Sequence, residues 1–316
     1  NPIPEGLTDK EATYVLGAQG NVWTEYMQTE KQVEYMAYPR AVALSEVLWS
    51  SPEHKNYSDF INRLEQYQKR LDLLEVNYAN HIYSVKGKLT HLSDRLTFEL
   101  NTTSSSYPIY YSTDRSFPSK LYSTPITIDA SMHIKAVVLD SKKTALGAIF
   151  QQEINLHKGV GASIAIDKEP HPAYNTGGKD ALINGVSGNN KRYGDREWLG
   201  FLGEDIEITI EFDKPTNINS VATRFFNGNG QWIYAPKEIN LQLKLEDGRA
   251  ISTLKKIENT KSLLVDFKLN ISQFSEDENL KATELKITIP SYGNIPEGKQ
   301  GAGHKAWTFI DEIIIN

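Results

Sequence analysis

Residues 14–25 read YVLGAQGNVWTE, and this stretch decides how the N-terminal part of the chain is interpreted. The apolar run Tyr14–Ala18 predicts a short buried strand, and the Gly and Asn residues after it predict a turn. Beyond the turn, Thr29 predicts the N-cap of a helix, Pro39 the first turn of a second helix, and Ser58 the N-cap of a third. The order of strand, polar turn and helix is typical of a βα unit.

The N-terminal region is too small to close a sheet by itself. One strand and three helices in about 83 residues cannot bury both faces of a parallel strand, whereas a complete (β/α)₈ barrel takes about 250 residues. Residues 1–83 are therefore predicted to be the C-terminal βα units of an incomplete (β/α)₈ barrel, with the cluster Gln19–Glu25 at its active-site face. Because position 1 is Asn and no signal peptide is present, we expect a processed chain or part of a longer protein.

Two stretches carry a specific resemblance. Residues 16–25 (LGAQGNVWTE) and 38–49 (YPRAVALSEVLW) together resemble the C-terminal end of a family 20 glycoside hydrolase. These enzymes are β-N-acetylhexosaminidases on a (β/α)₈ barrel, so the resemblance implies substrate-assisted hydrolysis of terminal non-reducing N-acetylhexosamine residues from glycans. It also implies that Trp23 lines the floor of the sugar pocket and that Glu25 accepts hydrogen bonds from sugar hydroxyls.

The catalytic pair of that family has no counterpart in the expected context. The family places an adjacent Asp-Glu pair in a His-x-Gly-Gly-Asp-Glu motif, and Asp-Glu occurs here only at 277–278 and 311–312, outside such a motif. The chain contains no Gly-x-Ser-x-Gly elbow and no phosphate-binding loop either. The chain alone is thus predicted to be inactive and to need the missing N-terminal part of the barrel as its partner. A non-enzymatic glycan-binding accessory protein is the alternative, and the family implies a periplasmic or extracellular location.

From residue 84 the hydrophobic period changes from 3.6 to 2. Residues 84–160 are predicted to be a small β-sandwich that resembles the fibronectin-like domain of bacterial hexosaminidases, with the role of a spacer. Residues 161–316 are also predicted to be rich in strands. The predicted β runs are Leu96–Leu100, Ile109–Ser112, Ile126–Ile128, Ile134–Leu139, Ile206–Phe212, Ser220–Phe225, Ile239–Leu245, Leu263–Leu269, Glu284–Ile289 and Thr308–Ile315.

The last region resembles discoidin-like jelly rolls, the fold of family 32 carbohydrate-binding modules, through segments that include ALING (181–185), WLGF (198–201) and WIYAP (232–236). The resemblance implies loops at one end that bind glycans, and a structural Ca²⁺ in a nearby loop; no other cofactor is required. The candidate glycan-binding residues are Trp232, Tyr234, Arg224, Asn227 and His304. The candidate metal ligands are Asp180, Asn184 and Glu312, where Asn184 replaces the usual Asp and weakens the site for a cation that prefers charged oxygens.

Composition excludes several classes of protein. The formal net charge of −6 argues against a nucleic-acid partner, and no apolar run approaches the length of a membrane span. The absence of Cys excludes disulfides, zinc-thiolate sites and thiol catalysis. The predicted strand and helices in residues 14–48 keep apolar faces. A freestanding glycan-binding accessory protein would expose these faces, and an exposed apolar patch promotes aggregation, so they favour a piece of an enzyme over that alternative. If the chain is expressed alone, we expect residues 1–83 to pack on the sandwich or on a second copy.

Overall fold

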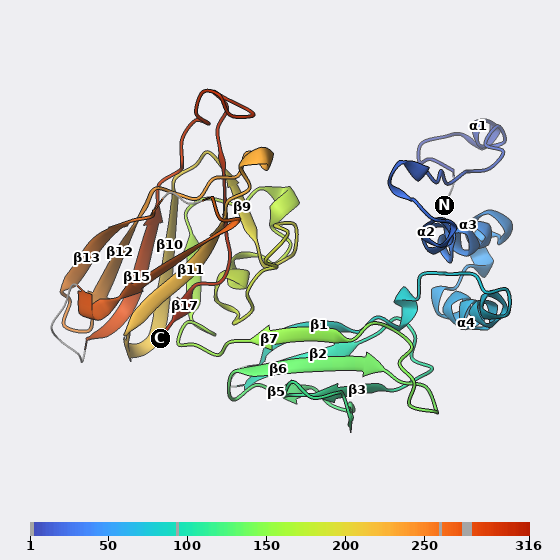
Figure 1. The fold of residues 1–316 in the computed structure, drawn as a ribbon, viewed down its shortest axis with the longest axis horizontal. Coiled ribbons are helices and arrows are strands. Elements are labelled where there is room, and N and C mark those ends of the chain that lie inside the picture. The colour runs from blue at the N-terminus through green and yellow to red at the C-terminus, as the bar shows by residue number, and fades with distance from the viewer. Residues whose placement is uncertain (1–2, 93–94, 259–260, 274–279) are drawn as a thin grey trace. The chain divides into compact units, whose positions relative to one another are not determined.

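The computed structural model describes residues 3–92, 95–258, 261–273 and 280–316 and divides into two compact units. The first unit comprises Asn1–Lys88, Glu99–Pro125 and Lys135–Gln151, and the second comprises Leu89–Phe98, Ile126–Ile134 and Gln152–Asn316 (Figure 1). Residues 84–160 contribute to both units, so the predicted domain boundaries at 83 and 160 stay a prediction.

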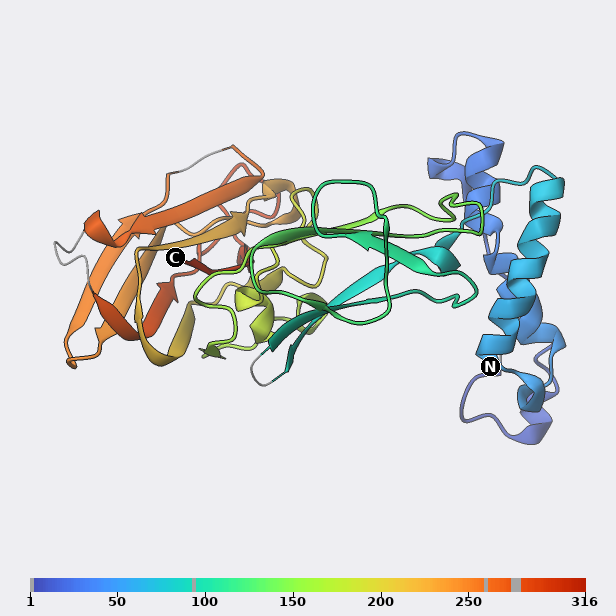
Figure 2. The ribbon, with the colours of Figure 1, turned by 90° about the horizontal axis from the view of Figure 1, so that it is seen from below.

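Within the described residues, the first unit holds all of the α-helices. They are α1 (Asp9–Ala12), α2 (Glu30–Ala37), α3 (Arg40–Trp49) and α4 (Tyr57–Leu73), and they group together in both ribbon views (Figures 1 and 2). None of the helices in the described ranges has the length and hydropathy that a membrane span requires.

Local signals explain where these helices begin. Thr29 caps α2 as predicted: its Oγ1 accepts a hydrogen bond from the Gln32 backbone N–H at 3.3 Å, and Gln32 Oε1 accepts in return from the Thr29 N–H at 3.1 Å. Pro39 was predicted in the first turn of the second helix; it stands one residue before α3, at the N-cap position. The prediction for Ser58 is wrong by two residues, because Asn56 caps α4 by accepting from the Asp59 N–H at 3.0 Å.

The predicted strand Tyr14–Ala18 is wrong, because these residues form irregular backbone and the side chain of Leu16 is 97% exposed. A parallel strand needs a hydrogen-bonded neighbour and a covering layer, and no described strand pairs with this segment. The helices α1, α2 and α3 bury no residue at all. Only α4 has a buried face, which consists of Ile61, Leu64, Glu65, Gln68 and Leu71.

Two small antiparallel sheets follow the helices. The first has the order β1-β2-β5 and the second the order β4-β3-β6-β7. The predicted run Ile109–Ser112 is confirmed to the residue as β3. The other strands are β1 (Lys86–Leu92), β2 (Arg95–Asn101), β4 (Lys120–Leu121), β5 (Ile126–Thr127), β6 (Met132–Val138) and β7 (Phe150–Ile154).

The second unit contains a β-sandwich of two antiparallel sheets. One sheet has the order β13-β12-β15-β10-β8, and the other has the order β14-β11-β16-β9 with β17 paired to β11. The strands are β8 (Ser163–Ile166), β9 (Leu199–Leu202), β10 (Ile206–Asn217), β11 (Ser220–Phe226), β12 (Glu238–Leu245), β13 (Ala250–Lys256), β14 (Leu264–Asn270), β15 (Lys281–Ile289), β16 (Trp307–Ile310) and β17 (Ile314–Ile315).

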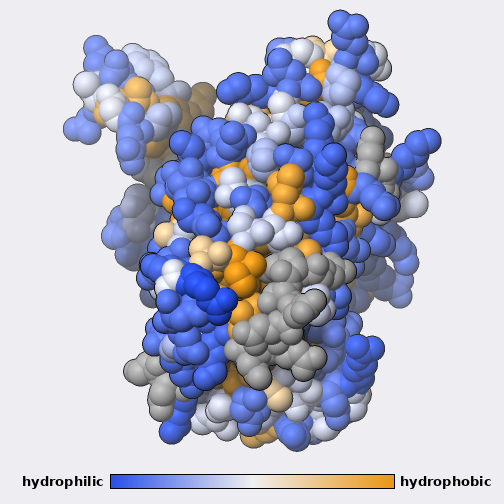
Figure 3. Space-filling model, turned by 90° about the vertical axis from the view of Figure 1, so that its left-hand side faces the viewer, coloured by the Kyte–Doolittle hydropathy of each residue, from blue (hydrophilic) through white to orange (hydrophobic). Residues whose placement is uncertain are grey.

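The core of the sandwich follows from the two-residue period of its strands. Burial alternates along β12 and β14, and both sheets contribute inward side chains to one cluster that includes Ile208, Leu285 and Phe225. A second cluster consists of Trp198, Phe226, Ile233 and Phe309. The face of the molecule in Figure 3 is largely hydrophilic, with only small apolar patches.

The predicted run Thr308–Ile315 is split in the structure. β16 ends at Ile310 and β17 begins at Ile314, so Asp311 and Glu312 stand between two strands rather than inside one. This break turns both carboxylates into the protein interior, where Asp311 is 0% and Glu312 is 1% exposed. The strands β8, β9 and β13 were not predicted, because their short or exposed stretches lack a clear apolar alternation.

Candidate functional site

The first candidate site lies on the loop that precedes α2. Trp23 stands at the N-cap position of the short 3-10 helix Thr24–Tyr26 without a side-chain capping bond and is 75% exposed, and Glu25 is exposed two residues later. The loop lies close to α3, because a Cβ at Gly20 would stand 3.8 Å from Leu44 Cδ2. An uncovered indole face and a free carboxylate thus share one short segment, and both are chemically able to contact a sugar.

The surroundings of this loop are apolar and only partly covered. The helix α3 reads RAVALSEVLW; none of its residues is fully buried, Leu44 and Val47 are half-buried, and Trp49 at its end is 90% exposed. Of the two Asp-Glu pairs, residues 277–278 lie outside the described residues, and residues 311–312 are buried in the sandwich.

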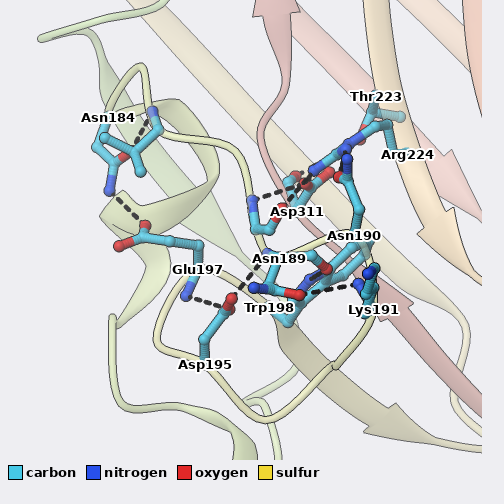
Figure 4. Close-up of polar contacts among 12 residues, drawn as sticks. Asn184, Asn189, Asn190, Lys191, Asp195, Glu197, Trp198, Thr223, Arg224 and Asp311 are labelled. Carbon is cyan, nitrogen blue, oxygen red and sulfur yellow. Dashed lines mark hydrogen bonds and ion pairs between the residues drawn. The ribbon is translucent and has the colours of Figure 1, made fainter. Parts of the chain in front are cut away.

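Arg224 is engaged in a buried ion pair rather than free to contact a ligand. It projects from β11, its Nη2 pairs with Asp311 Oδ2, and its Nε donates to the same oxygen at 3.0 Å (Figure 4). Asp311 Oδ2 also accepts from the Gly188 N–H at 2.9 Å. Burial raises the pKa of Asp311 to about 6, although the hydrogen bond and charge of Arg224 act in the opposite direction.

The same guanidinium holds the loop that precedes β9. Arg224 Nη2 donates to Gly188 O at 2.8 Å, and Nη1 donates to Asn190 Oδ1 at 2.7 Å. The indole of Trp198 donates to Asn189 O at 3.1 Å beneath the same loop (Figure 4). These contacts fix the loop between residues 184 and 198 onto the sheet, so Arg224 has a structural role here.

Two more of the predicted glycan-binding residues are also built into the fold. Tyr234 is only 5% exposed and packs against Tyr292 with ring centroids 4.6 Å apart. Asn227 donates from Nδ2 to Ser262 O at 3.0 Å and accepts from Asn229 Nδ2 at 2.9 Å. The Tyr234 ring is therefore buried, whereas Asn227 is half-buried with both ends of its amide hydrogen-bonded within the chain.

Trp232 and His304 are the predicted residues that the structure brings together. Their rings stack with centroids 5.0 Å apart and an angle of 18° between their planes. Trp232 lies in the left-handed region with φ 65°, a conformation in which a bulky residue is an outlier. Gly301, at φ +81°, lets the dark red loop of Figure 1 approach the indole, since a Cβ there would lie 2.4 Å from the ring. The exposed His304 ring thus lies over the half-buried Trp232 ring, and its outer face is the one presented to solvent.

The predicted calcium ligands do not assemble a coordination sphere. Asn184 uses its Oδ1 to accept from the Val186 N–H at 2.7 Å and its Nδ2 to donate to Glu197 Oε2 at 2.8 Å. Asp180 is exposed, and the buried Glu312 carboxyl contributes one oxygen, Oε2, without a hydrogen-bond partner. Ca²⁺ takes six to eight oxygens, and the described residues contain no group of three or more acidic, His or Cys side chains placed for a metal. The side chains of Asp180, Asn184 and Glu312 therefore do not by themselves supply the oxygens that Ca²⁺ takes.

The buried partner of Glu312 is His157, a residue that the sequence analysis did not identify. Its Nε2 lies 2.5 Å from Glu312 Oε1, and its side chain is 0% exposed. The two residues are 155 positions apart, so no local spacing could have paired them.

Two segments of the chain match known protein families. Residues 1–52 match the family described as glycosyl hydrolase family 20, catalytic domain, and residues 91–151 match the chitobiase/beta-hexosaminidase C-terminal domain. The resemblance to family 20 enzymes is confirmed. The matches cover these two segments and leave the predicted barrel geometry untested.

Two curated relatives bear related names. The beta-hexosaminidase of Porphyromonas gingivalis (strain ATCC BAA-308 / W83) is 36% identical over 133 residues, which cover 40% of this chain and 17% of that protein. The beta-N-acetylhexosaminidase of Cellulomonas fimi is 34% identical over 53 residues, which cover 17% of this chain and 11% of that protein. The chain therefore spans less than a fifth of the length of these relatives.

Solved structures similar to the chain include two isolated modules. The family 32 carbohydrate-binding module of Streptococcus pneumoniae EndoD is 14% identical with a TM-score of 0.33 and covers 51% of this chain and 99% of that one. The C-terminal domain of a chitobiase from Bacteroides fragilis is 16% identical with a TM-score of 0.31 and covers 50% of this chain and 95% of that one.

Proposed function

We propose that this chain forms the C-terminal part of a β-N-acetylhexosaminidase that removes terminal N-acetylhexosamine residues from glycans by substrate-assisted catalysis. The observation that carries the proposal is the exposed pair Trp23 and Glu25, which lies inside the segment that matches the family 20 catalytic domain. In this role the indole forms the floor beneath the sugar ring, and the carboxylate accepts hydrogen bonds from its hydroxyls. The family relationship of the named relatives supports the reaction class.

The rest of the catalytic barrel is the proposed partner of residues 1–49. The supporting observation is that the apolar side chains of α2 and α3 are at most half-buried, and that Leu16 on the preceding loop and Trp49 at the end of α3 are almost fully exposed. Covering such a surface is favourable by about 25 cal/mol per Å² of apolar area removed from water. The general acid and the orienting carboxylate come from that partner, so the chain by itself is inactive.

The experiment compares the chain alone with the protein encoded by the whole surrounding reading frame. On a chromogenic N-acetylglucosaminide, we expect turnover only from the longer protein. In that protein, Trp23→Ala and Glu25→Gln lower kcat/KM by about 10²-fold or more, since both contacts act on the reacting sugar. Tyr57→Ala, which removes an exposed aromatic ring at the start of α4, is the matched control and leaves kcat/KM unchanged. Turnover by the 316-residue chain alone would contradict the proposal that the general acid and the orienting carboxylate come from the rest of the barrel.

A second proposed activity is glycan binding by the sandwich, supported by the stacked surface of Trp232 and His304. Aromatic rings are the usual platform for the apolar face of a sugar, and the strained backbone of Trp232 is typical of binding loops. Titration of the chain with chito-oligosaccharides tests it: His304→Ala weakens binding, whereas His171→Ala, which removes another exposed His of the same unit, does not. Equal binding by both variants would count against this site. Action on such glycans places the protein in the periplasm or outside the cell.

A further inference from the structure

His157 lies between β7 and β8, and its ring is enclosed by backbone groups of two segments. Nδ1 accepts hydrogen bonds from the Gly159 N–H at 3.1 Å and from the Ile315 N–H at 3.3 Å. A neutral imidazole has one N–H, so a ring whose Nδ1 accepts carries its proton on Nε2. Nε2 therefore donates to Glu312 Oε1, which is 2.5 Å away.

Glu312 extends this connection to a third segment. The same oxygen, Oε1, accepts from the Gly185 N–H at 2.7 Å. The Gly185 carbonyl in turn accepts from the Asn155 N–H at 2.8 Å, two residues before the histidine. A Cβ on Gly185 would lie 2.8 Å from Asn155 O, so the close approach requires glycine. One buried carboxyl thus joins the chain around residue 157, the turn at 185 and the C-terminal strand β17.

A divalent cation at the predicted calcium position would connect the same elements, since it would join the turn at Asn184 to Glu312. The side chain of Asn184 is already saturated by Val186 and Glu197, as described above. Of the two Glu312 oxygens, Oε1 already accepts from His157 and from Gly185, so only Oε2 is left for a cation.

We propose that the imidazole of His157 takes the structural place that the discoidin-like resemblance assigns to Ca²⁺. It ties Glu312 and the Gly185 turn to the start and the end of the sandwich by hydrogen bonds. The sandwich consequently folds and remains stable without a divalent cation.

The test is thermal unfolding of the whole chain, with and without CaCl₂ and with a chelator. We expect the wild-type transition of the sandwich to stay within about 1 °C in all three conditions, because a ligand that binds the folded state would raise it by several degrees. His157→Ala lowers the transition by roughly 5 °C or more, since it leaves buried polar groups unpaired. Lys168→Ala, which removes an exposed side chain of the same unit, leaves it unchanged.

A second variant keeps the proposal testable if His157→Ala does not fold. Glu312→Gln retains an oxygen that accepts from His157 and Gly185 but removes the negative charge that a cation requires. We expect this variant to fold with a transition near that of the wild type and with no response to Ca²⁺. Stabilisation of the wild type by Ca²⁺ that the chelator reverses would overturn the proposal. So would a wild-type transition temperature in His157→Ala, or a large loss in Glu312→Gln.

Discussion

The helix α3 and the strand β11 are both rich in large apolar side chains, yet they end in opposite environments. α3 carries Val, Leu and Trp side chains that are at most half-buried, whereas β11 has Val221 and Phe225 fully inside the sandwich. The helix forms because hydrogen bonds within a helix are local, and the strand forms because it has partners on both edges in β14 and β16. The difference shows that a segment can form regular secondary structure without being buried. Burial of its side chains needs, in addition, a second layer that packs against it.

The largest expected effect separates two aromatic side chains, one from each region. Phe225→Ala leaves a cavity in the sandwich core and lowers the free energy of unfolding by about 3–5 kcal/mol. Trp49→Ala, in contrast, changes it by no more than about 0.5 kcal/mol, because the side chain is exposed. Denaturant unfolding of the whole chain measures both. Equal losses would mean that α3 has a packed partner within this chain.

A similar contrast applies to two arginine ion pairs. Arg224→Ala leaves the buried carboxyl of Asp311 without its partner and is expected to cost about 3 kcal/mol. Arg63→Ala breaks a pair with Glu46 between α3 and α4 that lies at the surface, and it costs about 0–1 kcal/mol. Both values come from denaturant unfolding, and the Arg63 variant serves as the control. A loss below 1 kcal/mol for Arg224→Ala would show that the loop at Gly188–Asn190 does not depend on the guanidinium.

The buried histidine predicts a smaller effect that depends on pH. Burial lowers the folded-state pKa of His157 to about 4, so between pH 6.5 and 4 the unfolded chain binds a proton that the folded chain does not. The free energy of unfolding therefore falls as the pH decreases through this window, by on the order of 2–3 kcal/mol. The raised pKa of Asp311, about 6, acts in the opposite direction over a similar range, because there the folded state binds the extra proton.

The difference between wild type and His157→Gln reports the contribution of His157 together with its partner Glu312, whose pKa burial raises, because the contribution of Asp311 is present in both proteins. We expect the two stabilities to converge as the pH falls from 6.5 toward 4. Stability curves that remain parallel over this window would mean that His157 takes up a proton as readily in the folded protein as in the unfolded chain.

The smallest effect on stability concerns the uncovered surface of residues 1–49. Replacing Leu16 and Trp49 together with Asp changes the free energy of unfolding by no more than about 0.5 kcal/mol. It removes apolar contact area, so sedimentation velocity should show weaker association with a second copy than in the wild type. Wild-type chain that sediments as a compact monomer at all concentrations would contradict this expectation.

The success of sequence reasoning varied with the range of the interactions involved. β3 and the capping box at Thr29 were predicted correctly, because alternation and capping are readable within a few residues. The strand at Tyr14–Ala18 was wrong because its formation requires neighbours that do not appear in the described structure. Trp23 and Glu25 stay a prediction from the resemblance, on a loop that leaves both exposed.

The glycan-binding and metal predictions in the sandwich were limited because residue type does not reveal whether the fold already uses a side chain. Residue type alone marked Arg224 and Tyr234 as able to contact a sugar, but the fold uses them for an ion pair and a packed ring. The same limit applies to Glu312. Its carboxyl was identified as a candidate ligand, while the histidine that occupies its oxygen lies 155 residues away.

The sequence by itself determined the change from helical to β periodicity, most strand positions and the resemblance of residues 1–52 to a family 20 catalytic domain. Only the tertiary structure decided which polar side chains are free for a ligand and which are structural. The physical reason is that a carboxylate or guanidinium has the same chemistry wherever it stands in the sequence. Whether it meets water, a ligand or a buried partner such as His157 depends on contacts between segments that are distant along the chain.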